Sequence, residues 1–178
     1  KMERDVPVRA ELQLEVAEAH ILVGPVLTEP LFVRVTGPQA QVEKLDYIAT
    51  DSVKLQEIRE QVDLVSALRH PERTRLVLNP RSVRIRADIQ ILAEDDLSGV
   101  PIKMRNGGNV QLRPDPAIAR VKVRGGVDVI AQLDPIKDIE LYVDYAEFQG
   151  DSLPIRNAEA PFFDVLSITP SEVNLVGD

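Results

Sequence analysis

The chain has 178 residues, 44% of them hydrophobic and 28% charged, which is typical of a globular protein. Its formal net charge is −8, and no stretch gathers enough cations for a phosphate-binding stripe, so nucleic acid is not an expected partner. The chain contains no cysteine, which excludes disulfides and thiolate metal sites. No segment reaches the roughly 18 consecutive apolar residues that a membrane helix requires.

The first half of the chain is predicted to be mostly β. In the sequence VRVTG, residues 33–37, apolar and polar residues alternate as in a strand with one buried face, and Gly37 is expected to mark a sharp turn. A short helix should begin at Pro38, because the apolar residues that follow keep helical spacing. These residues are Val42, Leu45 and Ile48. Further strands are expected over residues 11–16, 75–78 and 83–91.

Residues 56–69 are the ambiguous part of the first half. Ile58, Val62 and Val65 keep helical spacing, but no comparable pattern occurs at the corresponding place in the second half. The segment is therefore interpreted as a loop, with one helical turn as the alternative.

The second half repeats the landmarks of the first in the same order. Val121, Val123 and Gly125 correspond to Val33, Val35 and Gly37. The other matched pairs are Val6 with Val100, Pro7 with Pro101, Val8 with Ile102, Ile48 with Ile136, Val53 with Leu141, Leu55 with Val143, Pro80 with Pro170 and Val83 with Val173. A second short helix is expected around Ile130 and Leu133, ending before Pro135. Strands are expected over 117–123, 139–145 and 172–176.

The repeat predicts a mostly β fold with short helices, built from two tandem small modules. The boundary is placed near Asp95 to Gly99, and the acidic cluster from Glu94 to Asp96 is expected to form a solvated turn between the modules. The predicted modules are residues 1–95 and 96–178.

No pattern of catalytic or ligand-binding residues stands out, so we do not expect an enzyme, a cofactor or a metal. The two histidines, His20 and His70, lie far apart in the sequence, and the serines lack a G-x-S-x-G motif. The glycine-rich run from Arg105 to Gly108 is expected to be a hairpin-type turn, because no helix follows it that could help bind a phosphate.

A protein-binding surface is the remaining functional candidate, since exposed strand edges and aromatic side chains can both bind a partner. The aromatic residues of the second half that could form it are Tyr142, Tyr145, Phe148, Phe162 and Phe163. We single out Tyr142, Tyr145 and Phe163, with Tyr142 and Phe163 as the first pair to inspect. Packing in the core is the competing interpretation for most of them.

The ordered landmarks VPV, EPLFVRVTGP, VEKLDYIATDSVKL and LVLNPRSVRIRADI resemble a YbbR module, and the second half is similar to a more divergent copy. The resemblance implies tandem β-rich modules at the extracytoplasmic face of the bacterial cytoplasmic membrane. The membrane anchor would be a helix that is not in this sequence.

The same resemblance implies a partner. The CdaR members of the family bind and regulate a membrane diadenylate cyclase, so the resemblance implies a non-catalytic regulator in cyclic di-AMP signalling. The alternative is a cell-envelope scaffold or spacer with another protein partner. The oligomeric state stays open.

Overall fold

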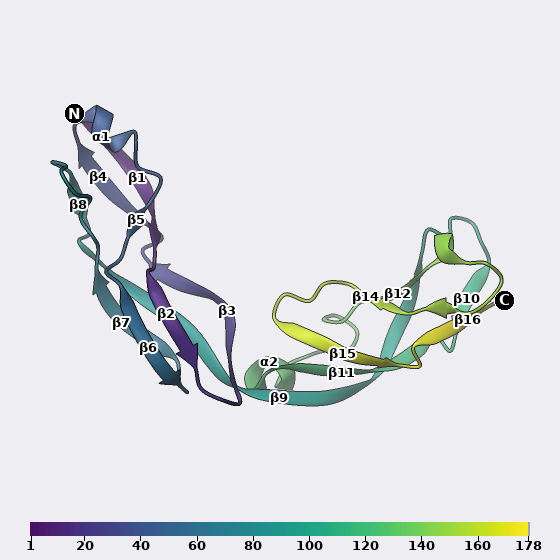
Figure 1. Cartoon of the computed structure of the whole chain (residues 1–178). Coiled ribbons are helices and arrows are strands. Elements are labelled where there is room, and N and C mark those ends of the chain that lie inside the picture. Colours follow the sequence, from purple (N-terminus) through teal and green to yellow (C-terminus); the bar gives the residue numbers. More distant parts are fainter. Residues whose placement is uncertain (178) are drawn as a thin grey trace. The chain divides into compact units, whose positions relative to one another are not determined.

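The structure is a computed structural model that describes residues 1–177. The chain folds into two compact units, Lys1–Gln90 and Ile91–Asp178. Both are built mainly of strands, which confirms the predicted fold class (Figure 1). Strand β9, Ser82–Arg105, has pairing partners in both units.

The first unit contains a four-stranded sheet in the order β5-β1-β4-β8 and a two-stranded sheet of β2 and β6. Strands β3 and β7 pair with β9. The bounds of its elements are β1 Met2–Arg9, β2 Leu12–Val16, β3 His20–Glu29, β4 Phe32–Gly37, α1 Gln39–Val42, β5 Ile48–Ala49, β6 Val53–Ile58, β7 Val62–Ala67 and β8 Val77–Asn79.

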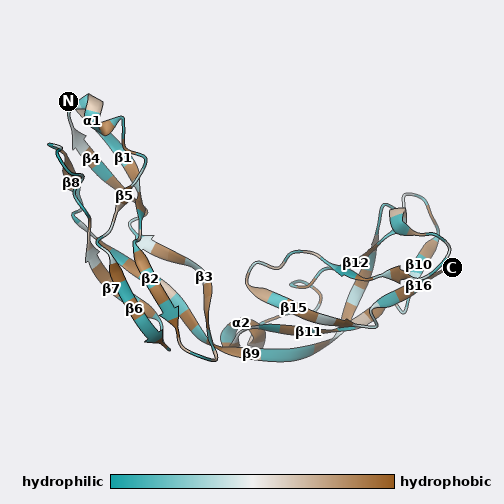
Figure 2. Cartoon of the chain, in the orientation of Figure 1, coloured by the Kyte–Doolittle hydropathy of each residue, from teal (hydrophilic) through white to brown (hydrophobic). Residues whose placement is uncertain are grey.

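The second unit contains part of a larger sheet, with strands in the order β14-β12-β9-β11-β15, and a three-stranded sheet in the order β10-β16-β13. The bounds of its other elements are β10 Leu112–Asp115, β11 Ile118–Gly126, α2 Val127–Ala131, β12 Leu141–Asp144, the 3-10 helix η1 Tyr145–Glu147, β13 Leu153–Pro154, β14 Arg156–Asn157, β15 Phe163–Thr169 and β16 Glu172–Gly177. Hydrophobic and hydrophilic residues alternate along strands such as β11 (Figure 2).

The two units share one pairing pattern. In the first, β1 pairs antiparallel with β4 and parallel with β5, and β4 pairs antiparallel with β8. In the second, β9 pairs antiparallel with β11 and parallel with β12, and β11 pairs antiparallel with β15. In both units a short helix follows the strand that contains the V-x-V-x-G motif.

This pairing corrects the predicted correspondence after the helix. Ile48 pairs with Val8 in the first unit, and Leu141 pairs with Ile102 in the second. Leu141 therefore holds the position equivalent to that of Ile48. Ile136, which the sequence pattern matched to Ile48, is 70% exposed because α2 ends at Ala131 and a turn follows.

The core of each unit consists of side chains from alternate strand positions. One cluster of the first unit comprises Val6, Val33, Val35, Val42, Ile48, Leu68, Leu76, Leu78 and Val83. A smaller cluster around Val62, Ala87 and Ile89 is covered by half-buried apolar residues. The cluster of the second unit comprises Val100, Ile102, Ala119, Val121, Val123, Ile130, Ile139, Leu141, Val143, Leu153, Ile155 and Val173. The alternating apolar residues of both V-x-V motifs are therefore core residues.

Two local predictions are wrong. Residues 56–69 contain the end of β6 and all of β7, and Val62 and Ser66 are buried while Val65 is 71% exposed, which is strand periodicity. The acidic residues Asp95 and Asp96, expected in a turn, lie within β9 opposite Val123 and Lys122 of β11.

Other expected features differ in detail. Pro38 has extended dihedral angles and precedes the first helical residue of α1. The run from Arg105 to Gly108 does turn, with positive φ at Asn106 and Gly108, but the next strand, β10, pairs with β16. Neither α1 nor α2 approaches the length and hydrophobicity needed to cross a membrane, and the same holds for every helix within residues 1–177.

Candidate protein-binding surfaces

The predicted aromatic residue Tyr142 lies on β12 among cationic side chains. The guanidinium carbon of Arg105 lies 3.6 Å from the centre of its ring. Tyr142 also pairs across the sheet with Lys103 on one side and Arg156 on the other. One face of the ring is thus occupied by a cation–π contact within the chain, which favours a structural role for that face.

The region after Tyr142 is a network of polar contacts. Asn106 donates a hydrogen bond to Asp144 at 2.8 Å, and the backbone N–H of Ala146 donates to the same oxygen at 3.0 Å. These two hydrogen bonds, the one from Asn106 first, lower the pKa of Asp144 below its ordinary value. Arg156 likewise binds Glu147 through two hydrogen bonds and lowers the pKa of that carboxyl group. These hydrogen bonds link the residues around η1 to Asn106 and Arg156.

Tyr145 and Phe163 occupy different places. Tyr145 stacks at a tilt on Phe148, with 5.7 Å between the ring centroids, and Phe148 packs against the core. Phe163 is half-buried against the same core from β15, and β9 and β11 separate β15 from β12 in the sheet. Tyr142 and Phe163 therefore do not form one patch. Their role in binding a partner stays a prediction.

Strand β15 is the last strand of its sheet among the described residues. Its inner side chains pack on the core, while Leu166 is 45% exposed at a register shift between Lys122 and Val123 of β11. The neighbouring Phe162 is 54% exposed. An open sheet edge with exposed apolar side chains can pair with a strand of another protein.

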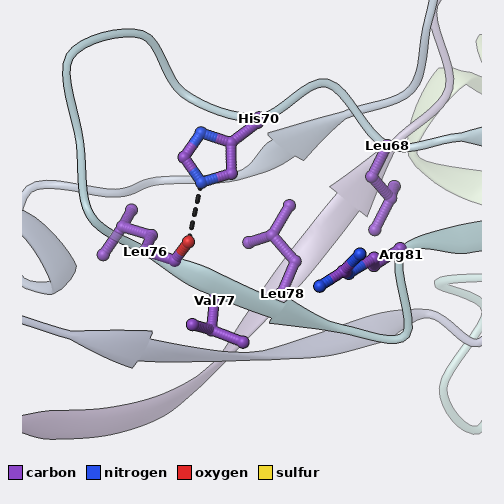
Figure 3. Close-up of a pocket in the computed structure, with 6 residues that line it drawn as sticks. All are labelled: Leu68, His70, Leu76, Val77, Leu78 and Arg81. Carbon is purple, nitrogen blue, oxygen red and sulfur yellow. Dashed lines mark hydrogen bonds between the residues drawn. The ribbon is translucent and has the colours of Figure 1, made fainter.

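The structure reveals a second surface that the sequence interpretation missed. A cavity of about 330 Å³ lies beside β8 and is lined by Leu68, His70, Leu76, Val77, Leu78 and Arg81 (Figure 3). The Nε2 atom of His70 lies within hydrogen-bond distance, 2.7 Å, of the carbonyl oxygen of Leu76. The sequence did carry one signal: residues 69–86 include six arginines and a single acidic residue, Glu72.

Both histidines contact backbone carbonyl oxygens in this structure. His20 Nδ1 lies 2.8 Å from the carbonyl oxygen of Glu18, and the two ring nitrogens of His70 each lie near a backbone carbonyl oxygen. Within residues 1–177, no three His, Cys, Asp or Glu side chains are grouped so that they could hold a metal ion.

Comparison with known proteins finds a family similarity over residues 6–91. The family model described as YbbR-like protein matches residues 6–91. The crystal structure of a YbbR-like protein from Streptococcus pneumoniae TIGR4 is 13% identical, with a TM-score of 0.41, and the match covers 99% of this chain and 96% of that chain. No curated protein matches this chain. YbbR-like domain proteins are not known catalysts. Residues 6–91 of this chain are thus the part that is similar to a YbbR-like domain.

Proposed function

We propose that this chain is a non-catalytic, protein-binding region of a membrane-anchored YbbR-like protein at the extracytoplasmic face of the cytoplasmic membrane. Its partner would be a membrane diadenylate cyclase, whose production of cyclic di-AMP it would regulate. The observation that carries the binding role is the open edge of β15, where Phe162 and Leu166 are exposed. Such an edge offers backbone hydrogen bonds and apolar contacts to an incoming strand.

We further propose that the second unit is a diverged YbbR module. The support is the shared pairing pattern: the antiparallel pair β9 and β11, the following helix α2 and the parallel strand β12 repeat the order of β1, β4, α1 and β5. In both units the V-x-V-x-G strand has a neighbouring strand on each side.

Two fragments of the second unit should differ in stability. A fragment of residues 91–178 keeps the β9 residues Ala93, Glu94 and Asp95 that pair with β11, whereas a fragment of residues 96–178, cut at the predicted boundary, lacks them. We expect the longer fragment to unfold cooperatively and the shorter one to unfold at a lower temperature. Thermal unfolding followed by circular dichroism measures both. Equal melting temperatures would contradict this expectation, and an unfolded longer fragment would contradict the proposal of an independent module.

The regulatory proposal predicts a clear change in cellular cyclic di-AMP when the full-length gene is deleted, and co-purification of the cyclase with the tagged protein. A Leu166→Lys variant should lose the co-purified cyclase because a lysine at the open edge disfavours strand pairing. The control is Val65→Lys, at a 71% exposed position on β7 of the first unit, which should retain it. Unchanged cyclic di-AMP without a bound cyclase, together with an envelope defect, would instead favour a scaffold.

A further inference from the structure

The cavity beside β8 is formed where two segments of the first unit diverge. At one end the backbone N–H of Leu68 donates to the carbonyl oxygen of Arg81 at 2.8 Å. At the other end His70 contacts the carbonyl oxygen of Leu76 at 2.7 Å. Between these two contacts the segment that includes Leu68 and His70 separates from β8, and the cavity opens (Figure 3). A whole strand could not enter without breaking these contacts, but a side chain could.

The floor of the cavity is apolar and its rim is cationic. Three leucines line the cavity and also belong to the core, namely Leu68, Leu76 and Leu78, each at most 8% exposed. Because core packing holds these side chains, the wall that they form is fixed. Figure 3 shows the side chain of Arg81 extending toward Leu78, and both residues line the cavity. An apolar pocket with a polar group at its edge is a typical arrangement for ligand binding.

The arginines of this region divide into two groups. Arg84 binds Asp63 through two hydrogen bonds of 2.6 Å, and Arg86 lies 3.3 Å from Glu29. Arg69, Arg73, Arg75 and Arg81 form no ion pair with any residue from 1 to 177, and all four are exposed. In a chain with a net charge of −8, the segment that borders this cavity is thus a local concentration of cations without acidic partners among the described residues.

We propose that this cavity, the β8 cavity, binds an acidic peptide segment of a partner protein. One apolar side chain of the segment enters the cavity and packs on the three leucines, and a neighbouring carboxylate pairs with Arg81. Arginine suits this role because its planar guanidinium binds a carboxylate through two hydrogen bonds. Arg69, Arg73 and Arg75 add long-range attraction for an acidic segment. The inference rests on the proposed protein-binding function and specifies the chemistry of the partner.

The first test uses purified protein and a fluorescein-labelled hexapeptide of alternating glutamate and leucine, with binding followed by fluorescence anisotropy. Arg81→Glu should weaken binding about tenfold or more, because a carboxylate would then face a carboxylate. The matched control is Arg59→Glu, at another exposed arginine of the first unit, which changes the net charge equally and should shift Kd by less than about twofold. Arg81→Gln, which adds no negative charge, should weaken binding to an intermediate extent, and circular dichroism checks that all three variants fold.

The peptide is then varied to separate the two contacts. Glutamine in place of glutamate should abolish the difference between wild-type protein and Arg81→Glu, and alanine in place of leucine should weaken binding to both. Equal loss of binding in Arg59→Glu and Arg81→Glu would overturn the proposal, because it would show nonspecific charge attraction. Binding of the protein to vesicles of anionic lipid, with no binding of the peptide, would also overturn it in favour of a membrane surface.

A second test separates this inference from the proposed function. The tagged full-length protein is compared with its Arg81→Glu variant for co-purification of the cyclase. Loss of the cyclase in the variant alone supports the β8 cavity as a contact site for the cyclase in addition to the edge of β15. Retention of the cyclase in both proteins overturns the β8 cavity as its site and leaves the regulatory function standing. Absence of the cyclase from both overturns the regulatory function, and the peptide titration then decides the cavity independently.

Discussion

Replacing Leu141 with alanine is expected to lower the free energy of unfolding of the second unit by about 2–5 kcal/mol, the range for deletion of a fully buried leucine side chain. Leu141 is 0% exposed and lies in β12 between β9 and β14, where it packs in the core of the unit. Flanking strands on both sides leave little freedom for the core to close around the cavity that alanine creates. Urea unfolding followed by circular dichroism measures the loss.

The control for this variant is Ile136→Ala. Both substitutions remove a branched apolar side chain from the same stretch of sequence, but Ile136 is 70% exposed and its loss should cost little. The sequence repeat alone matched Ile136 with the buried Ile48, so the two variants also test which residue is equivalent. A larger loss of stability for Ile136→Ala than for Leu141→Ala would contradict the strand pairing described above.

Replacing Gly37 with alanine is expected to destabilise the first unit by about 1–3 kcal/mol, the usual cost of overpacking a core. A Cβ atom at this position would lie 2.7 Å from Cδ2 of Leu76 and 3.2 Å from the carbonyl oxygen of Arg75. The leucine methyl group can move, but the backbone oxygen can do so only if the segment before β8 shifts. The melting temperature of the variant measures the effect.

The same substitution at two other glycines serves as a comparison for the loss of stability in Gly37→Ala. At Gly125 the nearest atom to an added Cβ, the Cβ of Phe163, lies 3.2 Å away, so Gly125→Ala should cost less than Gly37→Ala. At Gly177 no atom lies within 4 Å, and the substitution should have little effect. A Gly177→Ala variant as unstable as Gly37→Ala would show that loss of glycine as such, rather than contact with the neighbouring segment, causes the instability.

The glycine of the V-x-V-x-G motif illustrates how far the sequence could predict the fold. The alternation before Gly37 and Gly125 correctly indicated strands with one buried face. Strand β4 ends at Gly37 as expected, whereas β11 continues to Gly126. The sequence did not predict that both glycines are buried against a neighbouring segment. Such a contact joins residues far apart in the sequence, and local pattern does not contain it.

The candidate surfaces were predictable to different degrees. The arginines of residues 69–86 were visible in the sequence, but which of them lack an acidic partner depends on Asp63 and Glu29, which reach the region only through folding. Likewise, the aromatic character of Tyr142 and Phe163 was evident, whereas their separation by two strands follows from the order of the sheet. Periodicity over residues 56–69 misled because Ile58, Val62 and Val65 fit a helix by spacing alone, and strand pairing with β9 decided the conformation.

The open edge of β15 also bears on the tendency of edge strands to aggregate. Exposed edge strands can stack indefinitely into fibrils unless something interrupts the ladder. Here Pro161 and Pro170, which have no N–H to donate, flank Phe163–Thr169, and the register shift at Leu166 disrupts the regular spacing of the strand. The edge is therefore long enough to accept one short strand from a partner but too irregular to act as a template for repeated addition.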